Sequence, residues 1–235
     1  MTILLSERLR KVTEYIPIGA TIADIGSDHA YLPCYCVQHG IIIKAIAGEI
    51  NDGPYRSAFN QVKRLGLEQF IEVRLGDGLE VIEPGEASAV VIAGMGGQLI
   101  STILEQGKEN LQGVQRLVLQ PNVGARFIRN WLQENNWKLC NEAILEEDDK
   151  IYEILVAQPS DEVIKMTREE LLLGPFLMNE NNSTFQKKWK RESVNWERVL
   201  DQLNRACQSE EIEEKKKELR FKLSAVQSVV NNHSG

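Results

Sequence analysis

The chain reads ADIGSDHAYLP from Ala23 to Pro33, and this stretch decides the fold class. It joins an apolar, strand-like run to a helix-like segment through Gly26. A glycine in this place is typical of open α/β sheets, in which a ligand approaches the carboxyl ends of the strands. We therefore expect Gly26 to open a ligand-binding loop at that edge of a parallel sheet.

On either side of this loop, short apolar runs alternate with helix-like segments. Strands are predicted at 21–25, 45–50, 71–75, 89–93 and 116–119. Helices are predicted at 6–16, 30–39, 53–65, 98–107 and 124–135. The alternation predicts an α/β, Rossmann-like fold with helices on both faces of a mostly parallel sheet. Two further β-rich stretches, 138–146 and 151–157, flank an acidic turn and predict an antiparallel edge.

The pattern changes after Pro159. Apolar or small residues recur in steps of four and three from Trp189 to Cys207, and a second helical pattern runs from Ile212 to Val230. This spacing predicts a coiled-coil-like antiparallel hairpin, although two helices that simply pack on the main domain would show it too. We expect domains at 1–160 and 161–235. The short break between the two helices favours pairing within one chain, and hence a monomer over a homodimer.

The formal net charge is −7, from 27 Lys and Arg against 34 Asp and Glu. Residues 1–160 hold 14 basic and 21 acidic groups, whereas residues 161–235 hold 13 of each. Such a chain is not an obvious nucleic-acid binder, because phosphate neutralisation supplies most non-specific affinity. The hydrophobic content of 43% excludes a disordered or collagen-like chain.

The first residues, the apolar stretches and the cysteines indicate the expected cellular location. The first residues become charged too early for a signal peptide, and no apolar stretch approaches the roughly 18 residues of a membrane span. We therefore expect a cytoplasmic protein without membrane contact. In that reducing compartment the four cysteines are expected to be free thiols. With three histidines in the chain, no metal site is expected.

The loop after the first strand excludes the common phosphate-binding motifs. A dinucleotide fingerprint would need glycines at 26, 28 and 31, but Asp28 and Tyr31 stand at the last two positions. Asp28 places negative charge where a pyrophosphate approaches the backbone. An acidic loop of this kind suits a cofactor with a cationic group and no phosphate, and S-adenosylmethionine meets that description.

Acidic residues and glycines also stand at the ends of the other predicted strands. Glu49 ends the second strand, near the offset at which an acid meets ribose hydroxyls in this fold class. Asp77 follows the third strand, where a carboxylate can accept a hydrogen bond from an adenine amine. The expected cofactor contacts are Asp24, Gly26, Ser27, Glu49, Ile50, Asp77, Gly78, Ala93, Gly94, Met95 and Gly96.

Five motifs together resemble the bacterial TrmK family of tRNA adenine methyltransferases. They are DIGSDHAYLP (24–33), AGEI with the following DGP (47–54), GDGL (76–79), IAGMGG (92–97) and LQPN (119–122). The resemblance implies a class I methyltransferase domain followed by a coiled-coil-like helical domain. It also implies S-adenosylmethionine-dependent methylation of N1 of adenine 22 in tRNA.

The resemblance directs attention to three residues beside Gly26. Adenine N1 is already nucleophilic, so the enzyme chiefly has to align it with the methyl group and exclude water. We expect Asp28 to accept from the exocyclic amine, and His29 and Tyr31 to shape or stack the target pocket. The alternative for Asp28 is that it binds the methionine ammonium group or caps the next helix.

Cations and amides are the candidate tRNA contacts. The run at 187–191 holds four basic residues around Trp189 and could bind phosphates. In the alternative interpretation these residues only form the solvated face of a helix whose opposite face is the apolar seam. The candidates are Arg8, Arg10, Gln120, Asn122, Arg126, Arg129, Lys187, Lys188, Lys190 and Arg191. Two other functions stay open, namely a class I methyltransferase acting on a small molecule and a non-enzymatic Rossmann-type nucleotide-binding or scaffold protein.

Overall fold

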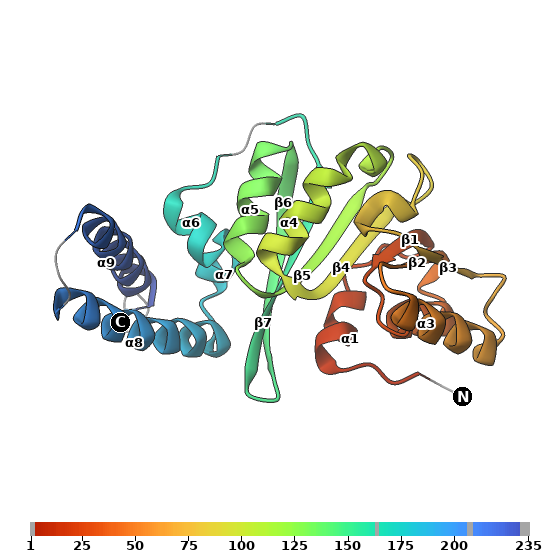
Figure 1. Cartoon of the computed structure of the whole chain (residues 1–235), viewed down its shortest axis with the longest axis horizontal. Helices are drawn as coiled ribbons and strands as arrows, with labels where there is room; N and C mark the ends of the chain where they lie inside the picture. Colours follow the sequence, from red (N-terminus) through yellow and green to blue (C-terminus); the bar gives the residue numbers. More distant parts are fainter. Residues whose placement is uncertain (1–2, 163–164, 206–208, 231–235) are drawn as a thin grey trace. The chain divides into compact units, whose positions relative to one another are not determined.

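The computed structural model describes residues 3–162, 165–205 and 209–230. It divides the chain into two compact units, Met1–Ile164 and Lys165–Gly235. The first unit is built on a seven-stranded sheet of order β3-β2-β1-β4-β5-β7-β6 (Figure 1). The strands are β1 (Ala20–Ile25), β2 (Ile42–Glu49), β3 (Ile71–Leu75), β4 (Ala89–Gly96), β5 (Arg116–Val123), β6 (Trp137–Glu147) and β7 (Lys150–Pro159).

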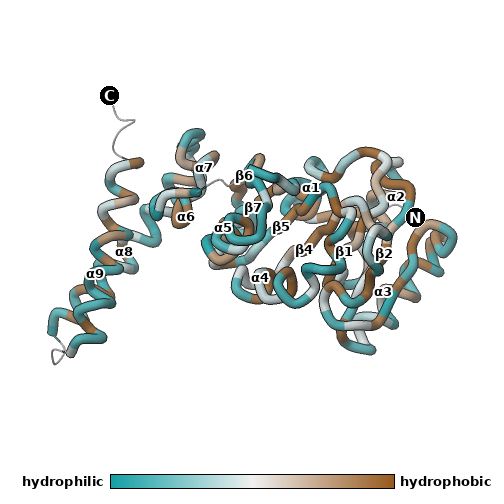
Figure 2. Tube along the Cα trace, turned by 90° about the horizontal axis from the view of Figure 1, so that it is seen from above, coloured by the Kyte–Doolittle hydropathy of each residue, from teal (hydrophilic) through white to brown (hydrophobic). Residues whose placement is uncertain are grey.

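The pairing confirms the predicted mixed sheet. Strands β1 to β5 are parallel, whereas β7 runs antiparallel to both β5 and β6. In Figure 2 the central strands β1, β4 and β5 run in brown through the middle of this unit. Most of their residues are apolar and buried, since both faces of the sheet are covered.

Two hydrophobic cores lie on the two faces of the sheet. One core receives side chains from α1 (Glu7–Thr13), α2 (Tyr31–Gln38) and α3 (Asp52–Leu65). The other receives them from α4 (Gly97–Gln106), α5 (Ala125–Glu134) and the short 3₁₀ helices η1 (Gly78–Val81) and η2 (Lys108–Leu111). Figure 1 shows α4 and α5 lying side by side over the sheet.

The first residue of α4 approaches the backbone between β5 and α5 so closely that it must be a glycine. A Cβ added to Gly97 would lie 2.1 Å from the carbonyl oxygen of Gly124, so a side chain cannot be accommodated there without moving backbone. Gly124 itself has a φ of 76°, in the left-handed region that favours glycine. The first residue of α4 therefore lies directly against the backbone of Gly124, just before α5.

Arg129 overturns one sequence prediction. Its side chain on α5 is fully buried, and its Nη2 atom lies 2.6 Å from Glu142 Oε1 and 2.7 Å from Glu153 Oε2. These two glutamates belong to β6 and β7, so the ion pairs tie α5 to the antiparallel edge. The prediction that Arg129 binds a tRNA phosphate is therefore wrong, because its guanidinium does not reach the surface.

The second unit contains four helices in its described residues, at α6 (Arg168–Leu173), α7 (Pro175–Glu180), α8 (Ser183–Arg205) and α9 (Glu210–Val230). Gly174 separates α6 from α7, and Pro175 is the first residue of α7. The helices α8 and α9 are antiparallel, since Asn181, just before α8, donates to the carbonyl of Val229 near the end of α9. Lys222 of α9 also lies over the Trp196 ring of α8.

The helical pair is confirmed, and its coiled-coil character stays a prediction. Trp189 and Phe185 are buried, whereas Trp196 and Leu200 are only half-buried. The last seam position, Cys207, lies outside the described residues. Across the described ranges, no helix combines the length and the apolar character needed to cross a membrane.

Candidate active site

A cavity of about 400 Å³ opens at the carboxyl ends of β1, β4 and β5. It lies between the adjacent strands β1 and β4. From β1 the chain continues to β2 on one side, and from β4 it continues to β5 on the other side. Ligands of open α/β sheets bind at such a switch point. The lining residues are Arg8, Leu9, Asp24, Gly26, Ser27, Asp28, Tyr31, Leu32, Ala93, Gly94, Met95, Asn122 and Tyr152.

The loop after β1 has an unusual backbone. Gly26 has a φ of 69°, and the next three residues in the left-handed region are Asp28, His29 and Ala30, none of which is glycine. Such residues each cost about 1–2 kcal/mol relative to the right-handed conformation. The main chain of the loop is anchored at its start, because the N–H groups of Gly26 and Ser27 both donate to the carbonyl of Gly48. Strain of this kind often accompanies functional loops.

Two carboxyl groups beside this loop favour a cationic ligand. Asp24 is buried and accepts a hydrogen bond from Ser27 Oγ, and burial raises its pKa to about 7. Glu49 Oε1 accepts from the backbone N–H of Asp28 at 2.5 Å, and burial raises the pKa of Glu49 too. A positive charge placed near them would stabilise both carboxylates, because its attraction offsets the loss of hydration on burial.

The predicted catalytic residues lie together at the rim. The Asp28 side chain is 84% exposed, and its Oδ1 atom is 3.5 Å from His29 Nε2. The rings of His29 and Tyr31 are stacked, with centroids 5.4 Å apart and an interplanar angle of 30°. Asp28 and Tyr31 line the cavity, whereas His29 supports the Tyr31 ring from beside it.

Two side chains of β5 hold the backbone of Gly94 near the end of β4. Gln120 Oε1 accepts from the N–H of Gly94 at 3.0 Å, and Asn122 Nδ2 donates to the carbonyl of Gly94 at 2.7 Å. Asn122 lines the cavity, as a substrate contact should. Gln120 is fully buried, so the structure places it behind the cavity wall, where it supports the end of β4.

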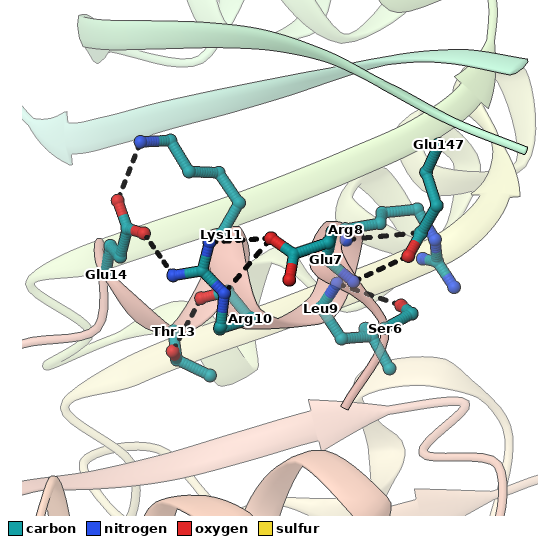
Figure 3. Close-up of polar contacts among 9 residues, drawn as sticks. All are labelled: Ser6, Glu7, Arg8, Leu9, Arg10, Lys11, Thr13, Glu14 and Glu147. Carbon is teal, nitrogen blue, oxygen red and sulfur yellow. Dashed lines mark hydrogen bonds and ion pairs between the residues drawn. The ribbon is translucent and has the colours of Figure 1, made fainter. Parts of the chain in front are cut away.

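The cations of α1 separate into two groups. Arg8 turns into the cavity, where its Nη1 atom donates to Gln120 Oε1 and its guanidinium lies over the Tyr152 ring, 5.4 Å from the centroid. Arg10 and Lys11 instead pair with the surface carboxylates of Glu7 and Glu14 (Figure 3). Among the described residues that line the cavity, Arg8 is the one basic side chain.

Other predicted cofactor contacts lie beside the cavity and not in its lining. The N–H of Gly76 donates to the carbonyl of Glu49 at 2.9 Å, which places Asp77 and Gly78 next to the end of β2. Ile50 is 58% exposed at that edge. Gly96 is the last residue of β4, the strand that also carries the lining residues 93–95.

The remaining predicted tRNA contacts are surface cations. Arg126, at the start of α5, is half-buried with its guanidinium 4.9 Å from the Phe127 ring centroid. On α8, Lys187, Lys190 and Arg191 are exposed and Lys188 lies over the ring of Trp189. Trp189 itself is 4% exposed, so its ring packs in the helical pair and is not presented to a nucleic acid.

Sequence reasoning missed three residues of the cavity lining. Leu9 and Leu32 belong to segments that were correctly predicted as helices, and helical spacing alone did not indicate which turn faces the cavity. Tyr152 comes from β7, where Tyr152 pairs with Leu145 of β6. The pairing of a distant hairpin decides its position, so no local signal near the glycine loop could have identified it.

Comparisons with known proteins agree with this geometry. The family model described as TrmK, tRNA (adenine(22)-N(1))-methyltransferase, matches residues 22–228. The chain is 50% identical over 232 residues to the protein of that name from Bacillus subtilis (strain 168), covering 97% of this chain and 98% of the relative. The crystal structure of Bacillus subtilis TrmK matches with a TM-score of 0.92 at 49% identity, over 97% of this chain and 99% of that one.

A further solved relative carries the expected cofactor. It is a Streptococcus pneumoniae tRNA methyltransferase in complex with S-adenosyl-L-methionine, with a TM-score of 0.87 and 40% identity. The match covers 97% of this chain and 100% of the relative.

Proposed function

The chain belongs to the TrmK family, and from this we propose that it transfers a methyl group from S-adenosylmethionine to N1 of adenine 22 in tRNA. The observation that carries the proposal is the family match over residues 22–228, joined to an acidic cavity at the switch point of the sheet. We further propose that residues 1–160 bind the cofactor and perform the reaction, and that the helical residues 161–235 assist tRNA binding.

The residues around the cavity fit the cofactor in charge and in size. S-adenosylmethionine supplies a methyl group activated on a sulfonium, and it also carries an ammonium group. Asp24 and Glu49 both have raised pKa values in a buried setting, which a cation would relieve. The cavity of about 400 Å³ lies within the range of small-molecule sites, on the order of 300–1,000 Å³.

The affinity for S-adenosylmethionine should fall as the pH is lowered through about 7. The Asp24 pKa is about 7 in the free protein, and a bound cation would lower it, so binding below that pH releases a proton. Calorimetry between about pH 7.5 and 5.5, below the usual pKa of an α-amino group, should show the dissociation constant rising as pH falls. Asp24→Asn should bind weakly and with a flatter profile. A dissociation constant of the wild type that stays constant across this range would contradict the role of Asp24.

The rim residues can hold the target base. N1 lies on the Watson–Crick edge, so adenine must be unpaired or turned out of a stack before it reacts. The exposed Asp28 carboxylate can accept from the exocyclic amine and favour the cationic product, while Tyr31 offers a ring for stacking. The walls formed by Leu9, Leu32 and Met95 exclude water from the reacting atoms.

The cations of α8 support binding of tRNA by its phosphates. Charge reversal of Lys187, Lys190 and Arg191 to Glu should weaken tRNA binding at least tenfold and reduce its dependence on salt. Filter binding at two salt concentrations measures both quantities. The affinity for S-adenosylmethionine should stay unchanged, since these side chains belong to the other unit. Unaltered tRNA affinity would show that the helical unit is structural.

Methyl transfer from labelled S-adenosylmethionine to unmodified bulk tRNA tests the proposed function. Incorporation into tRNA is the expected result. Cofactor binding without incorporation would favour a small-molecule methyltransferase, and binding of NAD in place of S-adenosylmethionine would favour a nucleotide-binding scaffold. The pairing of α8 with α9 inside one chain supports the accompanying proposal of a monomer, which sedimentation measures directly.

A further inference from the structure

The turn between β6 and β7 reaches across to the first helix of the chain. Glu147, the last residue of β6, accepts hydrogen bonds from the backbone N–H groups of Glu7 at 2.6 Å and of Arg8 at 3.2 Å. Figure 3 shows its carboxylate facing the first turn of α1. The two segments are 140 residues apart in sequence, so this contact is tertiary and not a local cap.

The α1 helix depends on outside contacts for its position. It has seven residues, and isolated helices shorter than about 12–15 residues are marginal in water. Its own cap, Ser6, accepts from the N–H of Leu9 only. Glu147 satisfies two further N–H groups of the first turn, and its negative charge suits the positive end of the helix dipole.

The same hairpin also contacts the Arg8 side chain. Tyr152 of β7 lies beneath the guanidinium, while Glu147 of β6 binds the backbone of the same residue. Asp148 and Asp149 form the turn between them, with φ values of 50° and 60°. A two-residue turn with both φ values positive gives a closely defined hairpin. The hairpin therefore presents two groups to one arginine in a fixed geometry.

These contacts fix the position of Arg8. Its side chain enters the cavity and donates to Gln120, which in turn holds the end of β4 through the N–H of Gly94. The guanidinium has five N–H donors in a rigid fork, and such a fork recognises phosphate well. A nucleotide turned out into this cavity brings its phosphate to the rim that Arg8 lines.

We propose that Glu147 is a positioning residue, which seats Arg8 in the cavity by binding the first turn of α1, and that Arg8 holds the phosphate of the target nucleotide. This rests on the proposed function, because Arg8 acts on the nucleotide that is methylated. Glu147 contacts the backbone of Arg8 but is not itself among the residues that line the cavity. Its effect on catalysis therefore passes through Arg8.

A double-mutant cycle between Glu147 and Arg8 tests the inference, with labelled methyl transfer to tRNA as the assay. Glu147→Ala should lower kcat/KM for tRNA at least tenfold and leave the dissociation constant of S-adenosylmethionine unchanged. Glu147→Gln, which keeps one acceptor oxygen, should lose less. In an Arg8→Ala background, Glu147→Ala should cause no further loss.

Glu14→Gln is the matched control. Glu14 lies at the other end of α1, where it pairs with Arg10 and Lys11, and its replacement should leave kcat/KM for tRNA near that of the wild type. The inference would be overturned if the loss of kcat/KM in the double variant equalled the product of the two single losses. Full activity of Glu147→Ala would also overturn it. Thermal unfolding of each variant identifies any that fails to fold, and for those Glu147→Gln replaces Glu147→Ala in the cycle. An inactive wild type would instead contradict the proposed function.

Discussion

Replacing Arg129 by methionine is expected to lower the free energy of unfolding by about 3–5 kcal/mol. The guanidinium is fully buried between Glu142 and Glu153, whose side chains are 0% and 3% exposed. Methionine fills a similar volume but leaves two carboxylates in the interior without a counter-charge. Urea denaturation measures the loss directly, and the midpoint of thermal unfolding should fall on the order of 10 °C for a unit of this size.

The two glutamates provide the control for this prediction. Adding Glu142→Leu and Glu153→Leu to Arg129→Met removes the uncompensated charges, and should recover most of the stability. Arg126→Met, on the same helix but half-exposed, should cost under about 1 kcal/mol. A change of less than 1 kcal/mol for Arg129→Met would show that the buried ion pairs do not hold α5 to the hairpin.

Replacing Asp28 by alanine is expected to lower kcat about 100- to 1,000-fold, the range seen when one stabilising polar group is removed from an active site. The carboxylate is largely exposed at the rim, where it can reach a target base. The affinity for S-adenosylmethionine should change much less, because Asp24 and Glu49 lie nearer to the buried part of the site. Single-turnover methyl transfer and calorimetry measure the two effects separately.

The backbone at Asp28 calls for a second variant. Its φ of 40° strains an alanine, whereas asparagine tolerates the left-handed region and keeps the shape of the side chain. Asp28→Asn should therefore retain cofactor binding and lose most of its turnover. Equal losses of turnover and cofactor affinity in Asp28→Asn would assign Asp28 to the cofactor site instead.

The fold was predictable because its signals are local. The strands β1, β4 and β5 coincide with apolar runs of the sequence whose residues are mostly buried. The two short helices α6 and α7 were not predicted, because six residues give too little periodicity to identify a helix.

The error at Arg129 had a visible signal. Ala125, Ile128 and Leu132 are the buried face of α5, and position 129 falls on that face at helical spacing. A cation on an apolar face indicates a buried ion pair more often than a phosphate contact. Its partners, Glu142 and Glu153, could not be identified from sequence, because the pairing of β6 with β7 brings them to α5.

The candidate site was predictable in part for the same reason. The strand-end residues Asp24, Gly26 and Gly94 meet in one cavity, since parallel strands bring their carboxyl ends to one edge. The inward turn of Arg8 and the contributions of Glu147 and Tyr152 depend on the antiparallel hairpin. Tertiary contacts of this kind leave no periodic pattern in the chain.

Mapping the methyl group on a defined tRNA transcript tests N1 methylation of adenine 22 most directly. The protein and labelled S-adenosylmethionine are incubated with a transcript that carries adenine 22, and with the same transcript carrying guanine there. A methyl group on N1 blocks the Watson–Crick edge, so reverse transcription stops beside the modified base. The expected result is a stop at the nucleotide on the 3′ side of adenine 22, with label in the first transcript and none in the second. Equal label in both transcripts, or a stop at another position, would contradict the proposed function.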